Sequence, residues 1–270
     1  MTTTVRLRGI EMAYEEAGRT DAPVVVLLHG YPLNRSMWSE QVDELSAHHR
    51  VVTPDLRGLG ETTAGGEATT MEEMAEDVAA LLDELQIRER VVLGGLSMGG
   101  YVSLAFYRLL PRRVRALILA DTRATPDTEE GRRGREESAQ KALEEGMELI
   151  ADAMLPKLLA PETLKQAHIT ERVRTMLTAT KPAGAAAALR AMSVRRDQRD
   201  MLPHIDVPTL ILVGSEDVLT PPADAEAMHR AIGGSRLEII DGAGHMPNVE
   251  RPSEFNRALS DFLDTVSDKQ

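Results

Sequence analysis

The sequence predicts an α/β fold: a mostly parallel sheet with helices on both faces and an inserted helical lid. Two observations carry this prediction. Strand-like and helix-like segments alternate through the first 124 residues, and most of the strand-like ones are continuous apolar runs. Such runs are typical of parallel strands that are buried on both faces. From about 125 to 203 no such run occurs, and the strand pattern resumes only at 208–214.

The amino-terminal part begins with two short strands, "TVRLRG" and "IEMAYEEAG", around a turn at Gly9. The run "VVVLLH" at 24–29 consists mostly of valine and leucine, so we expect a fully buried strand there. A helix is then expected over 36–47, a second buried strand over 50–55, and a loop over 56–67.

An amphipathic helix is predicted over 70–87. Methionine, valine and leucine recur there at helical spacing, and acidic residues occupy many of the other positions. A buried strand at 90–95, a helix at 99–110 and a strand at 114–121 follow. The helix is expected to stop before Pro111, because a residue that precedes proline is disfavoured in the helical conformation.

The character of the chain changes near residue 125. Charged helical pieces such as "REESAQKALEEG" replace the alternation, until a strand at 208–214, a helix at about 221–232, a strand at 236–241 and a final helix at 252–266 restore it. We therefore expect residues 1–124 and 204–270 to form an α/β core, and residues 125–203 to form a helical cap, or lid, inserted into it.

Composition excludes several classes of function. The formal net charge is −12, whereas a surface that binds nucleic acid or an anionic membrane needs a basic stripe. The chain has no cysteine, which excludes disulfides, zinc–thiolate sites and a cysteine nucleophile. The amino terminus lacks an apolar signal core, and no apolar run is long enough to span a bilayer. The default expectation is a cytoplasmic protein, monomeric or homodimeric, with no nucleic-acid or membrane partner.

One serine stands out within "RVVLGGLSMGGYVSLAF". Gly95, Ser97 and Gly99 form a G-x-S-x-G pattern at the junction of a predicted strand and helix, where a nucleophile elbow requires it. Side chains two residues from the serine would collide with the neighbouring strand and helix, so glycine is needed at both positions. The competing interpretation is a glycine-rich turn that happens to contain a serine.

A serine hydroxyl needs a base to take its proton, and elbow enzymes present the partners in the order serine, acid, histidine. Among seven histidines, only His245 follows Ser97 and also lies just after a predicted strand. The acid candidate is Asp217, after the penultimate strand; Asp121 is a competitor, and Glu216 would point differently. The competing interpretations are a solvated loop histidine and a helix-capping aspartate.

An oxyanion hole is expected at the same edge of the sheet. One donor should be the backbone N–H of Met98, the residue after the candidate nucleophile, and the other should come from the loop after the strand at 24–29. Gly30 allows a tight turn in that loop, which makes the backbone N–H of Tyr31 the second donor.

At these residues the chain resembles the α/β-hydrolase superfamily. The segments "HGYP", "DLRGLG", "GLSMGG", "LVGSEDVLTPP" and "GAGHMPNVERP" occur in the family's order across nearly the whole sequence. The segment "GLSMGG", the "TPP" after the acid and the pattern H-x-x-x-x-E-x-P resemble the 3-oxoadipate enol-lactonase-like and small carboxylesterase branch. Cofactor-free haloperoxidases and perhydrolases are also similar.

The resemblance implies the role of each candidate: Ser97 as nucleophile, Asp217 as acid, His245 as base, and the Tyr31 and Met98 amides as oxyanion hole. It implies a carboxylesterase-type serine hydrolase that acts on a small-molecule ester through an acyl-enzyme, with no metal or organic cofactor. Lactonase and perhydrolase activities use the same groups and stay open. A rival from another class is a ligand-binding receptor that keeps a hydrolase pocket.

The predicted cap should determine specificity. An apolar face at helical spacing is expected in part to line an acyl pocket, and it consists of Met147, Leu149, Ile150, Met154, Leu155, Leu158 and Leu159. Because the chain has only three Phe, four Tyr and one Trp, we expect aliphatic and methionine side chains, rather than stacked aromatic rings, around a short or medium acyl group.

Overall fold

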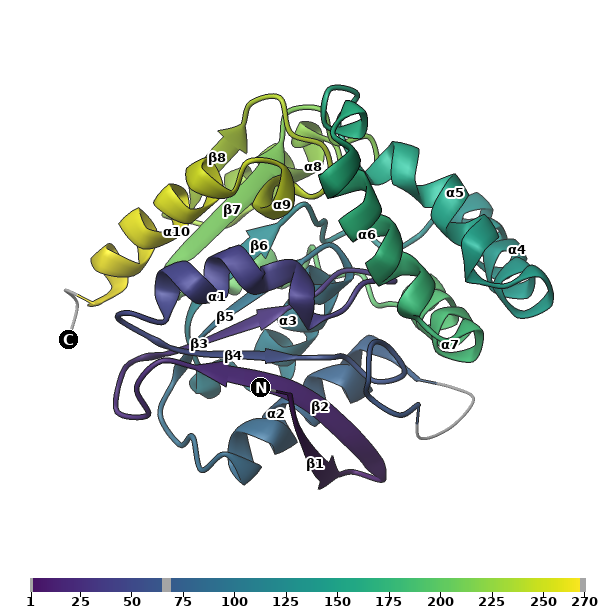
Figure 1. Ribbon diagram of the computed structural model, residues 1–270. Helices are drawn as coiled ribbons and strands as arrows, with labels where there is room; N and C mark the ends of the chain where they lie inside the picture. Colours follow the sequence, from purple (N-terminus) through teal and green to yellow (C-terminus); the bar gives the residue numbers. More distant parts are fainter. Residues whose placement is uncertain (1, 65–68, 268–270) are drawn as a thin grey trace.

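The computed structural model describes residues 2–64 and 69–267, so residues 65–67 of the predicted loop lie outside the described part. Within this part, eight strands form one sheet in the order β1-β2-β4-β3-β5-β6-β7-β8 (Figure 1). Strand β2 pairs antiparallel with β1 and with β4, and all other neighbouring strands in the sheet are parallel. The strands are β1 (Thr3–Leu7), β2 (Ile10–Ala17), β3 (Val24–Leu28), β4 (Arg50–Pro54), β5 (Val91–Leu96), β6 (Val114–Ala120), β7 (Thr209–Gly214) and β8 (Arg236–Ile240).

Helices cover both faces of the sheet, as the sequence predicted (Figure 1). Alternate side chains of β3 show why its apolar run is continuous: Val24, Val26 and Leu28 pack into one apolar cluster, and Val25 and Leu27 into a second. The first cluster includes residues of α2 (Met71–Glu84), α3 (Met98–Leu109) and α8 (Pro222–Ala231), and the second those of α1 (Ser39–Leu45) and α10 (Pro252–Ser267).

The predicted helix at 36–47 is a 3-10 turn followed by a shorter helix. The 3-10 turn η1 (Arg35–Trp38) begins after Asn34, whose side chain accepts a hydrogen bond from the Ser36 amide at 3.0 Å. A second difference is the short helix α9 (Pro247–Glu250), which the sequence had suggested to be part of a loop. The remaining 3-10 turns are η2 (Pro111–Arg113), η3 (Thr163–Lys165) and η4 (Leu202–His204).

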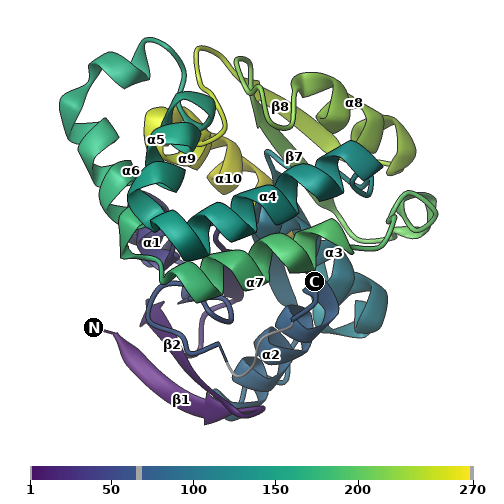
Figure 2. The ribbon, with the colours of Figure 1, turned by 90° about the vertical axis from the view of Figure 1, so that its right-hand side faces the viewer.

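Between β6 and β7 the described chain forms helices joined by loops. Its α-helices are α4 (Glu129–Glu145), α5 (Met147–Leu158), α6 (Ala167–Ala179) and α7 (Pro182–Ser193). Figure 2 shows α4 and α7 side by side. Small side chains permit this close contact, among them Ala139 and Ala142 on α4 and Ala185 and Ala188 on α7, all of them buried. No helix in the described residues combines the length and apolar character needed to cross a membrane.

Candidate active site

Ser97 occupies a sharp turn between β5 and α3. Its backbone has φ 54° and ψ −112°, a left-handed conformation that is strained for a residue with a side chain. A Cβ on Gly95 would lie 2.2 Å from the backbone of Gly99, and a Cβ on Gly99 would lie 2.2 Å from the carbonyl oxygen of Leu28. Both glycines are therefore sterically required, as the pattern predicted.

Hydrogen bonds hold the turn from the neighbouring strand. The Ser97 amide donates to the carbonyl of Ala120 at 2.9 Å, and the hydroxyl of Thr122 donates to the carbonyl of Ser97 at 2.8 Å. The elbow is thus fixed from β6 and the residues just after it, by one backbone carbonyl and one side-chain hydroxyl.

The structure brings Asp217 and His245 together. Asp217 follows β7 and His245 follows β8, and Nδ1 of His245 lies 2.8 Å from Oδ2 of Asp217. Asp217 is 3% exposed and His245 is 2% exposed. An Nδ1–H that donates to this carboxylate leaves Nε2 as the acceptor nitrogen, and His245 and Ser97 line the same cavity.

Asp217 is surrounded by donors. Its Oδ1 accepts from the amides of Leu219 at 2.8 Å and Thr220 at 3.1 Å, and its Oδ2 accepts from the Thr220 hydroxyl at 2.6 Å in addition to His245. Burial alone would raise the pKa of Asp217, but the charge of His245 and these hydrogen bonds outweigh it and hold the pKa below its usual value. The group is an ionised carboxylate at neutral pH, suited to orient an imidazole and stabilise its positive charge.

The two competing acids differ from Asp217. Glu216 is exposed to solvent. Asp121, at the end of β6, is 0% exposed, and burial followed by repulsion from Asp217 raises its pKa well above the usual value. Ligand atoms of Asp121, Asp217 and His245 lie within 4.8 Å of one another, a spacing that would suit a metal ion. Asp217 already accepts four hydrogen bonds, one of them from His245. The contact between Asp217 and His245 is therefore explained as an acid–imidazole pair and does not require a metal ion.

A buried glutamate that sequence reasoning did not assign a role holds the His245 loop. Oε1 of Glu250, on α9, accepts from the amides of Gly244 at 2.8 Å and Met246 at 3.3 Å, while Oε2 accepts from the amide of Ala160 at 2.7 Å. The His245 amide donates to the carbonyl of Leu158 at 2.9 Å. The loop is therefore tied to the end of α5. The signal in the sequence was the glutamate of the H-x-x-x-x-E-x-P pattern.

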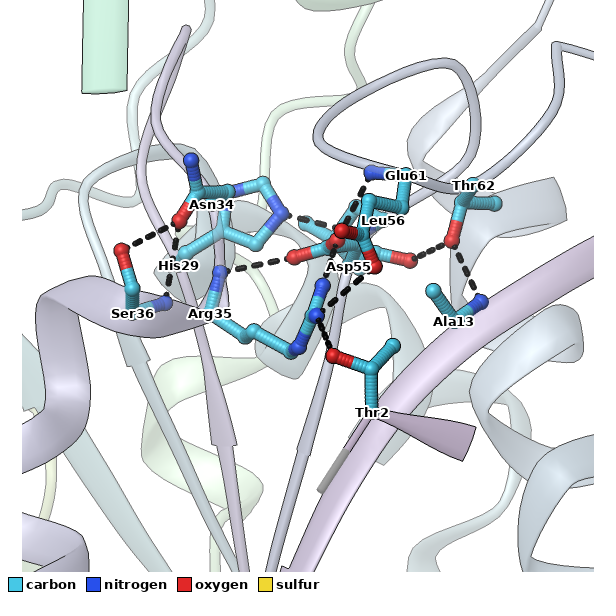
Figure 3. A network of polar contacts seen from close by, with 10 residues as sticks. All are labelled: Thr2, Ala13, His29, Asn34, Arg35, Ser36, Asp55, Leu56, Glu61 and Thr62. Atoms are coloured by element: carbon cyan, nitrogen blue, oxygen red, sulfur yellow. Dashed lines mark hydrogen bonds and ion pairs between the residues drawn. The ribbon is translucent and has the colours of Figure 1, made fainter. Parts of the chain in front are cut away.

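His29, which directly precedes Gly30 and Tyr31, belongs to a second network of polar contacts (Figure 3). His29 accepts from the Leu56 amide through Nε2 at 2.9 Å, so its Nδ1–H donates to the Gly30 carbonyl at 2.8 Å. Burial lowers the pKa of His29, which favours this neutral form. A Cβ on Gly30 would lie 3.5 Å from Cβ of Ser97, so the loop passes close to the candidate nucleophile.

Asp55 completes this network. Its carboxylate accepts from the amides of Arg35 at 2.7 Å and Glu61 at 2.8 Å, and it pairs with the Arg35 guanidinium (Figure 3). The Tyr31 side chain lines the cavity, and Met98 is the first residue of α3, whose N–H has no partner within the helix. The two candidate oxyanion donors thus belong to two segments that both lie next to Ser97.

The cavity has a volume of about 470 Å³. Part of its wall is apolar, as expected, and three residues of the predicted apolar face contribute to it: Ile150, Met154 and Leu158. Three cationic residues, Arg123, Arg135 and Lys157, also line it. The Nε of Arg123 and the hydroxyl of Tyr31 are buried without a hydrogen-bond partner among the described residues. Sequence reasoning missed these groups because they come from separate segments.

Comparisons with known proteins agree with one another. A sequence profile described as the alpha/beta hydrolase family matches residues 25–258. The chain is 31% identical over 260 residues to 3-oxoadipate enol-lactonase 1 of Acinetobacter baylyi, covering 96% of this chain and 95% of that protein.

Two solved structures extend this similarity to the fold. A thermophilic esterase from Thermogutta terrifontis, solved with malate bound, superposes with a TM-score of 0.94 and 40% identity over 98% of this chain and 99% of that one. The enol-lactonase from Burkholderia xenovorans LB400 superposes with a TM-score of 0.91 and 32% identity over 97% of this chain and 100% of that one.

Proposed function

The chain belongs to the alpha/beta hydrolase family, and on that premise we propose that it is a serine hydrolase that cleaves carboxylic esters through an acyl-enzyme. One observation carries the proposal: the strained Ser97 and His245 open into one cavity, and His245 is hydrogen-bonded to the buried carboxylate of Asp217. Nucleophile, base and acid are the three groups that such chemistry requires.

In the proposed mechanism His245 takes the proton of Ser97 through Nε2 while the serine oxygen attacks the ester carbonyl. His245 then protonates the leaving alcohol, and the Ser97 ester remains. A water molecule, deprotonated by the same nitrogen, attacks this ester, and His245 returns the proton to the Ser97 oxygen as the acid is released. Asp217 stabilises the imidazolium formed in each half of the cycle.

The proposed oxyanion hole consists of the backbone N–H groups of Tyr31 and Met98. Removing one such donor from related sites typically costs about 3 kcal/mol of transition-state stabilisation. The buried His29 and the network around Asp55 support this role because they fix the Gly30 carbonyl, immediately before Tyr31.

We propose that residues 125–203 act as the lid of this site and that the substrate carries a short or medium acyl group. A cavity of about 470 Å³ falls within the range of small-molecule sites, roughly 300–1,000 Å³. Helices α4, α5 and α7 contribute Arg135, Ile150 and Met192 to its wall.

A lactone is the second candidate substrate. Ring opening of a lactone is the same acyl transfer, and two of the relatives are named enol-lactonases. The Tyr31 hydroxyl and the Arg123 Nε, both buried without a hydrogen-bond partner among the described residues, favour a substrate with a polar group beyond the reacting carbonyl.

The test is Ser97→Ala assayed with p-nitrophenyl esters of increasing acyl length and with a lactone. We expect kcat to fall about 1,000-fold or more, and labelling of the wild type by a fluorophosphonate to be lost in the variant. Ser138→Ala is the matched control, because it removes a hydroxyl from the same cavity whose own bond is to the Gly134 carbonyl. Turnover or labelling retained in Ser97→Ala would refute the assignment.

A further inference from the structure

Asp121 places a second carboxyl group beside the candidate catalytic acid. It directly follows β6 and has φ 44°, a conformation held by its amide, which donates to the Leu212 carbonyl at 2.9 Å. Its Oδ1 accepts from the Gly214 amide at 2.9 Å. Its Oδ2 is buried and accepts no hydrogen bond from any described residue. The mechanism above makes no use of this group.

Two carboxylates in a dry site cannot both be ionised without a large cost in free energy. Asp217 receives four hydrogen bonds, whereas Asp121 receives one. The site therefore stabilises negative charge on Asp217 much better than on Asp121. If Asp121 and Asp217 hold one proton between them, that proton belongs on Asp121. Oδ2 of Asp121 is the oxygen that can carry it, because no donor among the described residues contacts it.

The other charges around Asp121 point the same way. Glu250 on α9 adds a second negative group. These charges are not offset nearby: His245 bonds to Asp217, and Arg123 pairs with Asp224 on α8 at 3.8 Å. Burial is the largest cause that raises the pKa of Asp121, and repulsion from Asp217 and then from Glu250 raises it further.

We propose that Asp121 is a positioning residue that stays protonated at neutral pH and donates a hydrogen bond from Oδ2 to the Asp217 carboxylate. Its role in catalysis rests on the proposed function. A neutral donor orients Asp217 and withdraws electron density from it without adding charge beside His245. The imidazole consequently holds a proton less tightly than it would beside an unassisted carboxylate.

The pH profile of kcat/KM separates this role from a structural one. Asp121→Asn keeps a neutral donor, so we expect its acid limb to stay in place and its kcat/KM to remain within about threefold of the wild type. Asp121→Leu removes the donor and should move the acid limb to higher pH. If Asp121 were ionised, both variants would lose a negative charge and their acid limbs would move to lower pH, which would overturn the proposal.

A second measurement needs no activity and is made in the Ser97→Ala background. An infrared carbonyl stretch of a buried protonated carboxyl should be present at pH 7 and absent after Asp121→Asn, with exposed Asp241→Asn as control. The unfolded chain loses this proton near pH ~4. Because the pKa of Asp121 is raised in the folded state, the native protein keeps the proton at higher pH.

The corresponding stability assay follows the unfolding constant against pH. Relative to Asp121→Asn, that constant should rise about tenfold per pH unit above pH ~4 until the folded group ionises. If the band is missing or the slope is flat, Asp121 is ionised and the proposal fails, whatever the catalytic activity. If band and slope are present but no substrate is turned over, only the proposed function fails.

Discussion

The two halves of the candidate site are built in opposite ways. The Ser97 half depends on the absence of side chains: at Gly95 and Gly99, neighbouring backbone atoms occupy the space that a methyl group would need. The His245 half depends on atoms that are present, above all the buried carboxylates of Asp217 and Glu250. The first half should therefore fail when an atom is added, and the second when a charge or a donor is removed.

The largest effect is expected from Gly99→Ala. The new Cβ would meet the Leu28 carbonyl oxygen at 2.2 Å, so α3 must move away from β3 and carry the Ser97 turn with it. Because a displacement of about 1 Å can cost 100-fold in rate, we expect kcat/KM to fall at least about 100-fold. The measurement is ester hydrolysis together with a thermal unfolding curve.

Gly233→Ala provides the control, since a Cβ there has no atom of the described residues within 4 Å and the exposed residue does not line the cavity. It should leave kcat/KM unchanged and the unfolding temperature close to that of the wild type, because the added methyl group meets none of these atoms. A fully active Gly99→Ala protein would contradict the view that the Ser97 half tolerates no additional side-chain atom.

Glu250→Gln tests the other half at a site that does not touch the cavity. The glutamine side chain keeps the shape of the carboxylate. Its NH₂ group, however, cannot accept a hydrogen bond, so at least one of the three backbone N–H groups that now donate to Glu250 loses its acceptor. We expect the His245 loop to shift and kcat to fall about 10- to 100-fold, with little change in KM.

The control is Glu254→Gln in the exposed first turn of α10, which should retain full activity. A decrease in stability for Glu250→Gln with kcat unchanged would mean that Glu250 supports the fold without orienting His245.

The smallest effect is expected from Thr220→Val. The substitution removes one of the four donors to Asp217 and keeps the side-chain shape. Since three donors remain, we expect kcat/KM to fall about 3- to 10-fold, in line with about 1 kcal/mol for one hydrogen bond. Exposed Thr175→Val, which loses only a bond to the Glu171 carbonyl, should have no effect. A 100-fold loss would show that the donors act cooperatively.

Sequence reasoning reached the parts of the site that depend on local pattern. The fold followed from alternating apolar runs. The requirement for Gly95 and Gly99 followed from the G-x-S-x-G spacing, because that spacing is typical of a strand–turn–helix elbow, although the atom that limits Gly99 is the distant Leu28 carbonyl. The contact between Asp217 and His245 was accessible because successive parallel strands end at one edge of the sheet.

What the sequence did not disclose depends on contacts across long distances in the chain. Ala160 and Glu250 are 90 positions apart, and His29 and Leu56 are 27 apart. Such pairs have no periodic signature, and a buried histidine looks like any other histidine in a sequence. The cationic groups of the cavity, Arg123 and Arg135, were missed for the same reason, since the surrounding residues give no sign that they face one space.

The hydrogen bond from Ala160 to Glu250 has a consequence for redesign. Its donor is a backbone N–H, which every residue type except proline supplies. This hydrogen bond therefore constrains the backbone path at residue 160. It places no requirement on the side chain at residue 160. Any exchange of helices α4 to α7 between family members must therefore keep the path of residue 160 and avoid proline there, so that this hydrogen bond to the Glu250 side chain beside His245 is retained.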